Sequence, residues 1–292
     1  MKQPPVDITK ISRLSRQIDP GVRSNRFVLG GAVVAALAAA AVAAMASADS
    51  VSWGVAAGGA VFLAWALARE IDPDHSGSAS IAMVLALPLL LMGRPSLLLV
   101  VGALMAARMI SGTVGGRLTI IDTVGMVVLA GLVGSRQGGL LVAAAMAGGF
   151  VVAQGLHRRS AIGAGSMLAT AAIVSTPFRA NPVAHGLAGG EAALLVASGI
   201  AGMVALRIEG VRSTTDVGAE PLSARRVRFA RIVVWGLVMV SGLVLGGVGV
   251  VALTPAAAAL AAVAIHSLQR SRGGAPPSGA PAAFAEVHTA PH

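Results

Sequence analysis

Hydrophobic residues occur along this chain in long, nearly uncharged runs that alternate with short polar segments. A helix needs about 20 apolar residues to cross the hydrocarbon core of a bilayer, and most of these runs approach that length. The pattern predicts an all-α, polytopic transmembrane helix bundle of about ten spans. The predicted spans are residues 27–48, 50–68, 78–93, 97–113, 119–135, 138–156, 161–176, 191–206, 232–253 and 255–268.

Two of these runs have an alternative interpretation. The run 255–268 would reach only about 21 Å as a helix, against about 30 Å of hydrocarbon, so nine spans are possible. The first run ends in Ala46-Ser47-Ala48, which is similar to a signal-peptidase site. The polar segment of 26 residues before it and the length of the run favour a retained helix instead.

The composition agrees with a membrane protein. Hydrophobic residues make up 55% of the chain and charged residues 12%, whereas an average soluble domain carries about 25% charged residues. A soluble enzyme of this composition would leave too much apolar surface in water. A disordered chain is excluded by the high hydrophobicity. The absence of cysteine excludes disulfides and thiolate ligands.

The positive charges give the chain an expected orientation. With the N-terminus in the cytoplasm and alternating spans, the outer loops hold only Arg94, Arg136 and Arg179 of the 22 Lys and Arg residues. This distribution follows the positive-inside rule and predicts a location in the bacterial inner or plasma membrane. The net charge of +10 therefore orients helices, and no basic patch interleaved with aromatic residues indicates nucleic-acid binding.

The same pattern divides the chain into three regions. Residues 1–26 form a basic cytoplasmic segment, residues 27–269 the transmembrane domain, and residues 270–292 a disordered tail. The longest internal loop is 207–231. Its arginines are expected to contact anionic headgroups, which makes membrane lipids the expected partners. These arginines are Arg225, Arg226, Arg228 and Arg231.

The first cytoplasmic turn carries a concentration of polar groups. It contains Arg69, Glu70, Asp72, Asp74 and His75. Carboxylates at this spacing suit Mg²⁺ or Mn²⁺, which prefer oxygen ligands and often hold substrate phosphates. The alternative is structural, because the Asp-Pro-Asp sequence is common in turns and the following serines can cap a helix.

A second polar feature is Asp122, which the pattern places about one turn inside an apolar span. A carboxylate there is costly to bury and is a candidate for function, with Arg108 as its expected partner. A buried Asp–Arg pair with a purely structural role is the alternative. The run His157-Arg158-Arg159 is either a phosphate-binding segment or a signal that stops translocation.

These groups are all expected at one side of the membrane. The candidate catalytic residues are Asp72, Asp74, His75 and Asp122, and the candidate metal ligands are Asp72, Asp74 and Asp122. The candidate substrate-binding residues are Arg69, Arg108, Arg117 and Arg158. The leading hypothesis is a cytoplasm-facing site that binds a divalent metal and a phosphorylated or lipid substrate.

Two other classes of function remain open at this point. A ten-helix transporter would require polar groups near the bilayer midplane, where this chain offers only Gln154 and Asp122. A non-catalytic assembly subunit also fits the pattern. The sequence has no G-x-x-x-x-G-K-[ST], H-E-x-x-H or G-x-S-x-G motif that would identify an enzyme class.

Overall fold

The computed structural model describes residues 12, 14, 23–113, 115, 117–176, 186–216 and 220–272, and within these ranges it is helical and has no strand. A single antiparallel bridge joins Thr214 and Pro221. The elements in chain order are α1 (Arg23–Met45), α2 (Ser50–Ile71), α3 (Ser76–Leu89), η2 (Leu90–Met92), α4 (Leu97–Ser111), α5 (Ile120–Gly134), α6 (Gly139–Gln154), α7 (Arg158–Ser175), α8 (Gly189–Leu206), α9 (Ala224–Leu245), α10 (Gly247–Ala252) and α11 (Thr254–Arg272).

Every apolar run predicted as a span forms a helix, which confirms the all-α class. Four helices are long and apolar enough to cross a membrane, namely α1, α2, α8 and α9. Large apolar side chains point away from the protein along α1, where Leu37 is 67% exposed and Met45 is 80% exposed. Apolar surface of this extent is stable in hydrocarbon and unstable in water, so the structure indicates a membrane protein.

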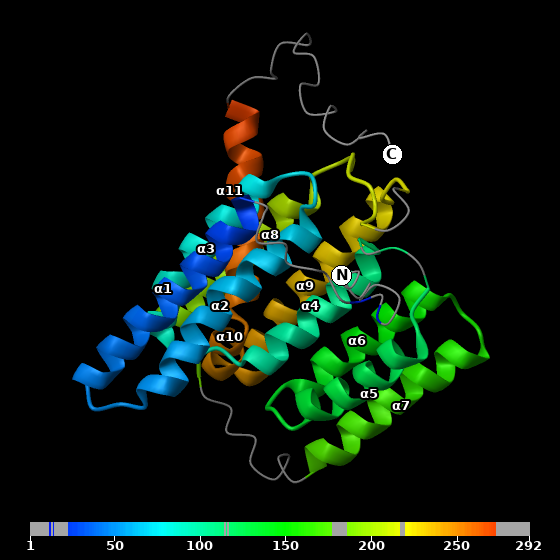
Figure 1. The fold of residues 1–292 in the computed structure, drawn as a ribbon, viewed down its shortest axis with the longest axis horizontal. Helices are drawn as coiled ribbons and strands as arrows, with labels where there is room; N and C mark the ends of the chain where they lie inside the picture. The colour runs from blue at the N-terminus through cyan, green and yellow to red at the C-terminus, as the bar shows by residue number, and fades with distance from the viewer. Residues whose placement is uncertain are drawn as a thin grey trace, which may run out of the picture.

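The helices are arranged around a shared centre (Figure 1). Helices α1, α2 and α3 pack side by side, and α5, α6 and α7 form a second group on the other side of the molecule. Helices α4 and α9 lie between these groups, because α4 contacts α2, α6 and α9. Helix α8 packs against α9 and α11.

Helix α11, which contains the shortest of the predicted spans, is among the most buried elements of the fold. It contacts α2, α3, α8 and α9, and residues 254–260 are buried without interruption. Its alanines allow neighbouring helices to approach closely, which explains its modest hydropathy. The helix continues to Arg272, so the predicted tail boundary at residue 270 is wrong by three residues. Residues 273–292 lie outside the described part of the chain.

Helix α9 begins at Ala224, and this corrects the predicted loop 207–231. The run from Arg225 to Arg231 is not loop but the first two turns of a helix. The described residues between α8 and α9 are 207–216 and 220–223, and they cross the end of the bundle where α2 stops and α3 starts (Figure 1).

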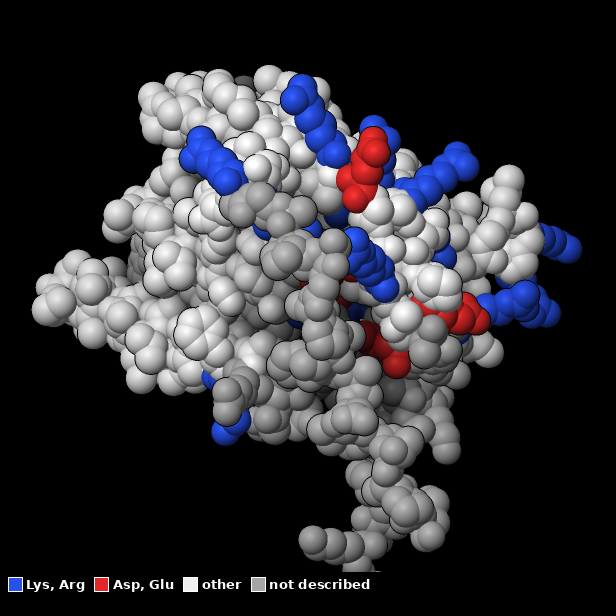
Figure 2. All heavy atoms as spheres, turned by 90° about the horizontal axis from the view of Figure 1, so that it is seen from above, with Lys and Arg blue, Asp and Glu red and all other residues white. Residues whose placement is uncertain are grey.

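We call this end of the molecule the charged end, because exposed arginines gather on it (Figure 2). It contains the C-terminal ends of α2, α4, α6, α8 and α11 and the N-terminal ends of α1, α3, α5, α7 and α9. Its exposed arginines within the described residues are Arg26, Arg117, Arg158, Arg159, Arg207, Arg212, Arg225, Arg228, Arg270 and Arg272. The opposite end carries the described charged residues Asp49, Arg94, Arg136 and Glu191.

Candidate functional site

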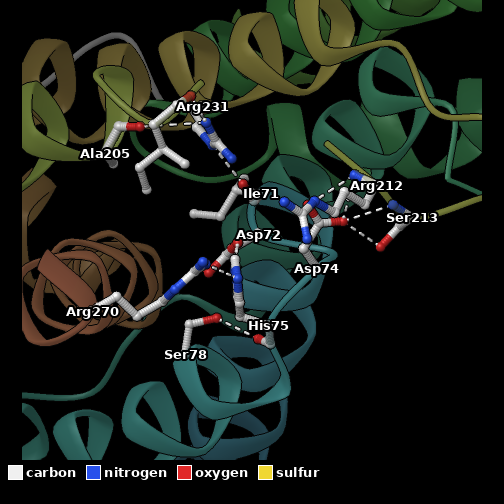
Figure 3. A network of polar contacts seen from close by, with 11 residues as sticks. Ile71, Asp72, Asp74, His75, Ser78, Ala205, Arg212, Ser213, Arg231 and Arg270 are labelled. Atoms are coloured by element: carbon white, nitrogen blue, oxygen red, sulfur yellow. Dashed lines mark hydrogen bonds and ion pairs between the residues drawn. The ribbon is translucent and has the colours of Figure 1, made fainter. Parts of the chain in front are cut away.

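The turn between α2 and α3 is the centre of the polar contacts at the charged end (Figure 3). Asp72 is the C-cap residue of α2, and its side chain is buried, with 4% of its surface exposed. Pro73 follows it, and the hydroxyl of Ser78 donates a hydrogen bond of 2.7 Å to the carbonyl oxygen of His75. The Asp-Pro pair ends α2, as the structural interpretation of this turn expected. The expected serine cap is wrong, because the N-cap residue of α3 is His75, which makes no side-chain capping hydrogen bond.

His75 is held between a carboxylate and a guanidinium. Its Nδ1 lies 2.8 Å from Oδ1 of Asp72, and its Nε2 contacts Nη1 of Arg270 near the end of α11. A carboxylate beside Nδ1 favours the tautomer in which that nitrogen carries the proton, so Nε2 is the acceptor that faces Arg270. The ring of His266 on α11 lies 5.1 Å away, centroid to centroid. His75 therefore contacts both Arg270 and His266 of α11.

Asp74 binds the segment that crosses the charged end. Its carboxylate accepts hydrogen bonds from the backbone N–H of Arg212 at 2.9 Å, the backbone N–H of Ser213 at 2.8 Å and the hydroxyl of Ser213 at 2.6 Å. Partial burial alone would raise the pKa of Asp74, but these hydrogen bonds, together with the nearby His75, lower it below the usual value. Asp74 therefore acts as a clamp that holds residues 212–213 against the α2–α3 turn.

A cavity of about 520 Å³ opens between this turn and the crossing segment. The side chains of Asp72, Asp74 and His75 line one side of it. The other side is formed by residues 208–213, which include Glu209 and Arg212, and by Arg270 from α11. The cavity thus combines an imidazole held by a carboxylate with two arginines, from three separate parts of the chain.

Two arginines of α9 point inward and hold helix ends together. Arg231 is 2% exposed, and its guanidinium donates to the carbonyl oxygens of Ile71 at 2.6 Å and Ile208 at 2.9 Å. Arg226 donates to the carbonyl oxygens of Met109 and Ile110 at 2.8 Å each. Lipid headgroups were expected to bind at both positions. For Arg231 this is wrong, because its guanidinium is buried and donates to backbone carbonyl oxygens inside the protein. Arg225 and Arg228 are exposed.

Glu70 lies next to this site in a buried network that the sequence did not indicate. Its side chain is completely buried and accepts a hydrogen bond of 2.8 Å from Nε of Arg108 and another from the hydroxyl of Thr113. Arg108 was expected to pair with Asp122, but its ion pair is with Glu70. A charge with no exposed surface requires such a partner, which gives the pair a structural role.

Asp122 has a different environment from the one predicted. It forms a capping box with Thr119 at the start of α5, and its Oδ1 accepts hydrogen bonds from the hydroxyl of Ser12 at 2.5 Å and the N–H of Leu14 at 3.4 Å. The carbonyl oxygen of Leu14 accepts a hydrogen bond of 2.9 Å from Arg108. The backbone of Leu14 thus connects the two side chains that were expected to bind each other directly.

The structure therefore brings together only some of the predicted site residues. Asp72, Asp74 and His75 line one cavity, but Asp122 does not line it. No group of three or more His, Asp or Glu side chains within the described ranges is placed to hold a metal ion. The four candidate substrate-binding arginines are dispersed as well. Arg69 lines an adjoining cavity, Arg108 pairs with Glu70, Arg117 lines a cavity beside α5, and Arg158 is exposed at the start of α7.

The residues that sequence reasoning missed come from distant parts of the chain. Arg212, Ser213 and Glu209 lie in the crossing segment, and Arg270 lies in what was expected to be a tail. The sequence placed Arg212 and Arg270 on the same side of the membrane as His75 by charge alone. It held no signal for their contact, because no periodicity relates residue 75 to residue 270.

Comparisons with known proteins found no relative of this chain. No family model, no curated protein and no solved structure matches the chain.

Proposed function

We propose that this membrane protein binds a phosphorylated ligand, either soluble or lipid-linked, in the cavity beside His75 at the charged end. The observation that carries the proposal is the Asp72–His75–Arg270 arrangement at the wall of a cavity of about 520 Å³. Arg270 and Arg212 are exposed cations beside it, and arginine is well suited to bind phosphate oxygens. His75 lies beside them with its tautomer set by Asp72, and it serves as the proton donor or acceptor at the bound group.

Asp72 and Asp74 do not prevent the binding of an anion in this cavity. Asp72 is buried against His75, and Asp74 is surrounded by the N–H groups of Arg212 and Ser213. A Mg²⁺ or Mn²⁺ ion at Asp74 would have to displace these hydrogen bonds, so the proposed binding step uses the arginines and not a metal. Whether a divalent ion adds to the binding is measured in the same experiment.

The proposed orientation has the charged end in the cytoplasm, with the N-terminus inside and ten helices crossing the membrane. The concentration of exposed arginines at this end supports it through the positive-inside rule. The chain has no cysteine, so single cysteines can report the topology. Gln137→Cys at the opposite end should react with an impermeant thiol reagent in intact cells. Gln269→Cys on α11 should react only after permeabilisation, and the reverse pattern would contradict the orientation.

The test of ligand binding is the thermal unfolding of the detergent-purified protein, followed by tryptophan fluorescence, with and without pyrophosphate and with and without Mg²⁺. A ligand that binds only the folded state stabilises it by about 2.7 kcal/mol at 100 times its dissociation constant. We expect pyrophosphate to raise Tm, and Arg270→Gln to remove most of this rise.

The matched control is Arg272→Gln, two residues further along the same helix and outside the cavity. This variant has the same change of charge and should retain the rise in Tm. A ligand effect that is equal in the two variants would contradict binding at His75. A rise that appears only with Mg²⁺ would show that a metal belongs to the site.

A transporter remains the second candidate, because a cavity also opens at the opposite end of the bundle. It has a volume of about 550 Å³, and its lining includes Arg94, Arg136 and Glu191. The short helix α10, which follows a break at Gly246, lines it as well. Interrupted helices often mark transport sites. Flux of phosphate compounds into proteoliposomes would favour this function, and no binding and no flux would favour an assembly subunit.

A further inference from the structure

A separate cavity opens at the charged end between α5, α6 and α7. It has a volume of about 410 Å³ and shares no lining residue with the cavity beside His75. The segment before α5, the end of α6 and the beginning of α7 form its walls, and Phe150 of α6 contributes apolar surface. Gln154 holds two of these walls together through a hydrogen bond of 3.2 Å to the carbonyl oxygen of Leu118.

The charged residues that line this cavity are all basic. Arg117, His157 and Arg159 line it together with apolar residues and hydroxyls, and none of its lining residues is acidic. Four other cavities within the described residues each include at least one Asp or Glu. Arg117 and Arg159 are exposed, and in the described part of the chain neither makes an ion pair or a hydrogen bond. These two cations therefore lack an anionic partner among the described residues.

The imidazole of His157 is oriented by the start of α7. Its Nδ1 accepts a hydrogen bond of 3.3 Å from the N–H of Ser160 and lies 2.8 Å from the hydroxyl of the same residue. A ring nitrogen that accepts carries no proton, so the neutral ring has its hydrogen on Nε2. The ring lines the cavity, and it contributes a third donor there beside the two guanidinium groups.

An apolar stripe leaves this cavity along α5. Ile120, Val124, Val128 and Leu132 are all exposed and follow one another at intervals of four residues, so they lie on one face of the helix. The first two of them line the cavity. From Ile120 to Leu132 the stripe is about 18 Å long. This matches the hydrocarbon depth of one leaflet, half of about 30 Å.

We propose that this cavity binds the phosphate group of one anionic phospholipid, and that an acyl chain of the same lipid lies along the α5 stripe. The cationic cavity without a carboxylate selects a negative headgroup, and the adjacent stripe selects a lipid over a soluble phosphate compound. The lipid is a bound constituent of the protein and is not the ligand of the cavity beside His75. The proposal is thus independent of the proposed function.

The experiment measures the thermal stability of the protein in neutral phosphatidylcholine nanodiscs into which phosphatidylglycerol is titrated. The key variant is Arg117→Gln/Arg159→Gln. The control is Arg207→Gln/Arg272→Gln, which removes two exposed arginines of the same end, one at the C-cap of α8 and one at the end of α11. All four side chains are exposed, so both variants should fold. Inorganic phosphate, added to phosphatidylcholine nanodiscs, tests a soluble anion.

We expect phosphatidylglycerol to stabilise the wild type and the control with a saturable dependence, and inorganic phosphate to have no comparable effect. The key variant should need about 25-fold more phosphatidylglycerol, since each of the two arginines near an anionic headgroup contributes about 1 kcal/mol, or about fivefold. An equal loss in both variants would attribute the effect to general surface charge and overturn the proposal. An equal effect of inorganic phosphate would overturn the lipid as the ligand.

Discussion

The guanidinium of Arg231 donates a hydrogen bond to the carbonyl oxygen of Ile71 at 2.6 Å, although 160 positions of the sequence separate the two residues. Ile71 is the last residue of α2, where the carbonyl groups have no partner within the helix. A cation is favourable at this negative end of the helix dipole. The same side chain reaches Ile208 beyond α8, so one arginine of α9 joins the ends of two other helices beside the candidate site.

Replacement of this arginine should therefore destabilise the whole bundle. Arg231→Met removes the donor from the buried carbonyl oxygen of Ile71 and the partly buried one of Ile208. A buried unsatisfied group costs about 1–3 kcal/mol. We expect a loss of about 2–5 kcal/mol in the free energy of unfolding, measured by thermal or denaturant unfolding in detergent. Arg228→Met, exposed on the same helix, should change it by less than about 0.5 kcal/mol. Similar effects of the two variants would contradict this role of Arg231.

The buried pair of Glu70 and Arg108 should show strong coupling in a double-mutant cycle. Glu70→Leu leaves a mostly buried guanidinium without its carboxylate, and Arg108→Leu leaves a fully buried carboxylate without its guanidinium. Each single change is expected to cost about 3–5 kcal/mol. The double variant should lose clearly less than the sum, by about 1–3 kcal/mol, because no unpaired charge remains. Additive effects would show that the pair does not stabilise the fold.

The clamp at Asp74 predicts a specific dependence of stability on pH. The pKa of Asp74 is lowered in the folded protein, against about 3.9 for an ordinary aspartate. Its ionised form is thus favoured by folding, and its contribution is complete above the unfolded value and is lost as the pH falls through the folded value. The difference in Tm between the wild type and Asp74→Asn should be constant from about pH 7 to 5 and decrease below about pH 4.

Ser213 provides the control for this titration. Ser213→Ala removes the hydrogen bond of 2.6 Å from its hydroxyl but leaves the two backbone donors. The variant should retain part of the stabilisation. Its loss on acidification should begin at the same pH, set by the unfolded value, and should be complete at a higher pH than in the wild type. A difference between wild type and Asp74→Asn that grows on acidification would have the wrong sign for a clamp by the carboxylate.

Close packing between α5 and α7 should depend on the absence of a side chain at Gly134. A Cβ there would lie 2.6 Å from the carbonyl oxygen and 2.7 Å from Cα of Ala171, and these backbone atoms cannot rotate away. We expect Gly134→Ala to lower the free energy of unfolding by about 1–3 kcal/mol. Gly148→Ala on α6 meets nothing within 4 Å. It should be neutral or stabilising by up to about 1 kcal/mol, through helix propensity.

The spacing of hydrophobic runs was sufficient to locate the helices, but it did not determine their ends. Helix α9 begins at Ala224, eight residues before the predicted span, because arginines are good helix formers and Arg226 and Arg231 find backbone carbonyl partners inside the protein. A hydropathy pattern treats an arginine as the limit of a span. It does not show whether the arginine can donate to an unpaired carbonyl group at the end of a neighbouring helix.

For the candidate site, the sequence determined which polar residues are close along the chain and which end of the bundle they share. Asp72, Asp74 and His75 line one cavity because a short turn between two helices holds them together. The tertiary structure alone decided which partners the buried charges have, since Arg108 pairs with Glu70, and Asp122 binds Ser12 and Leu14. Hydropathy reports the free energy of transfer of each single residue from water into hydrocarbon. An ion pair depends on how helices from distant parts of the chain pack together.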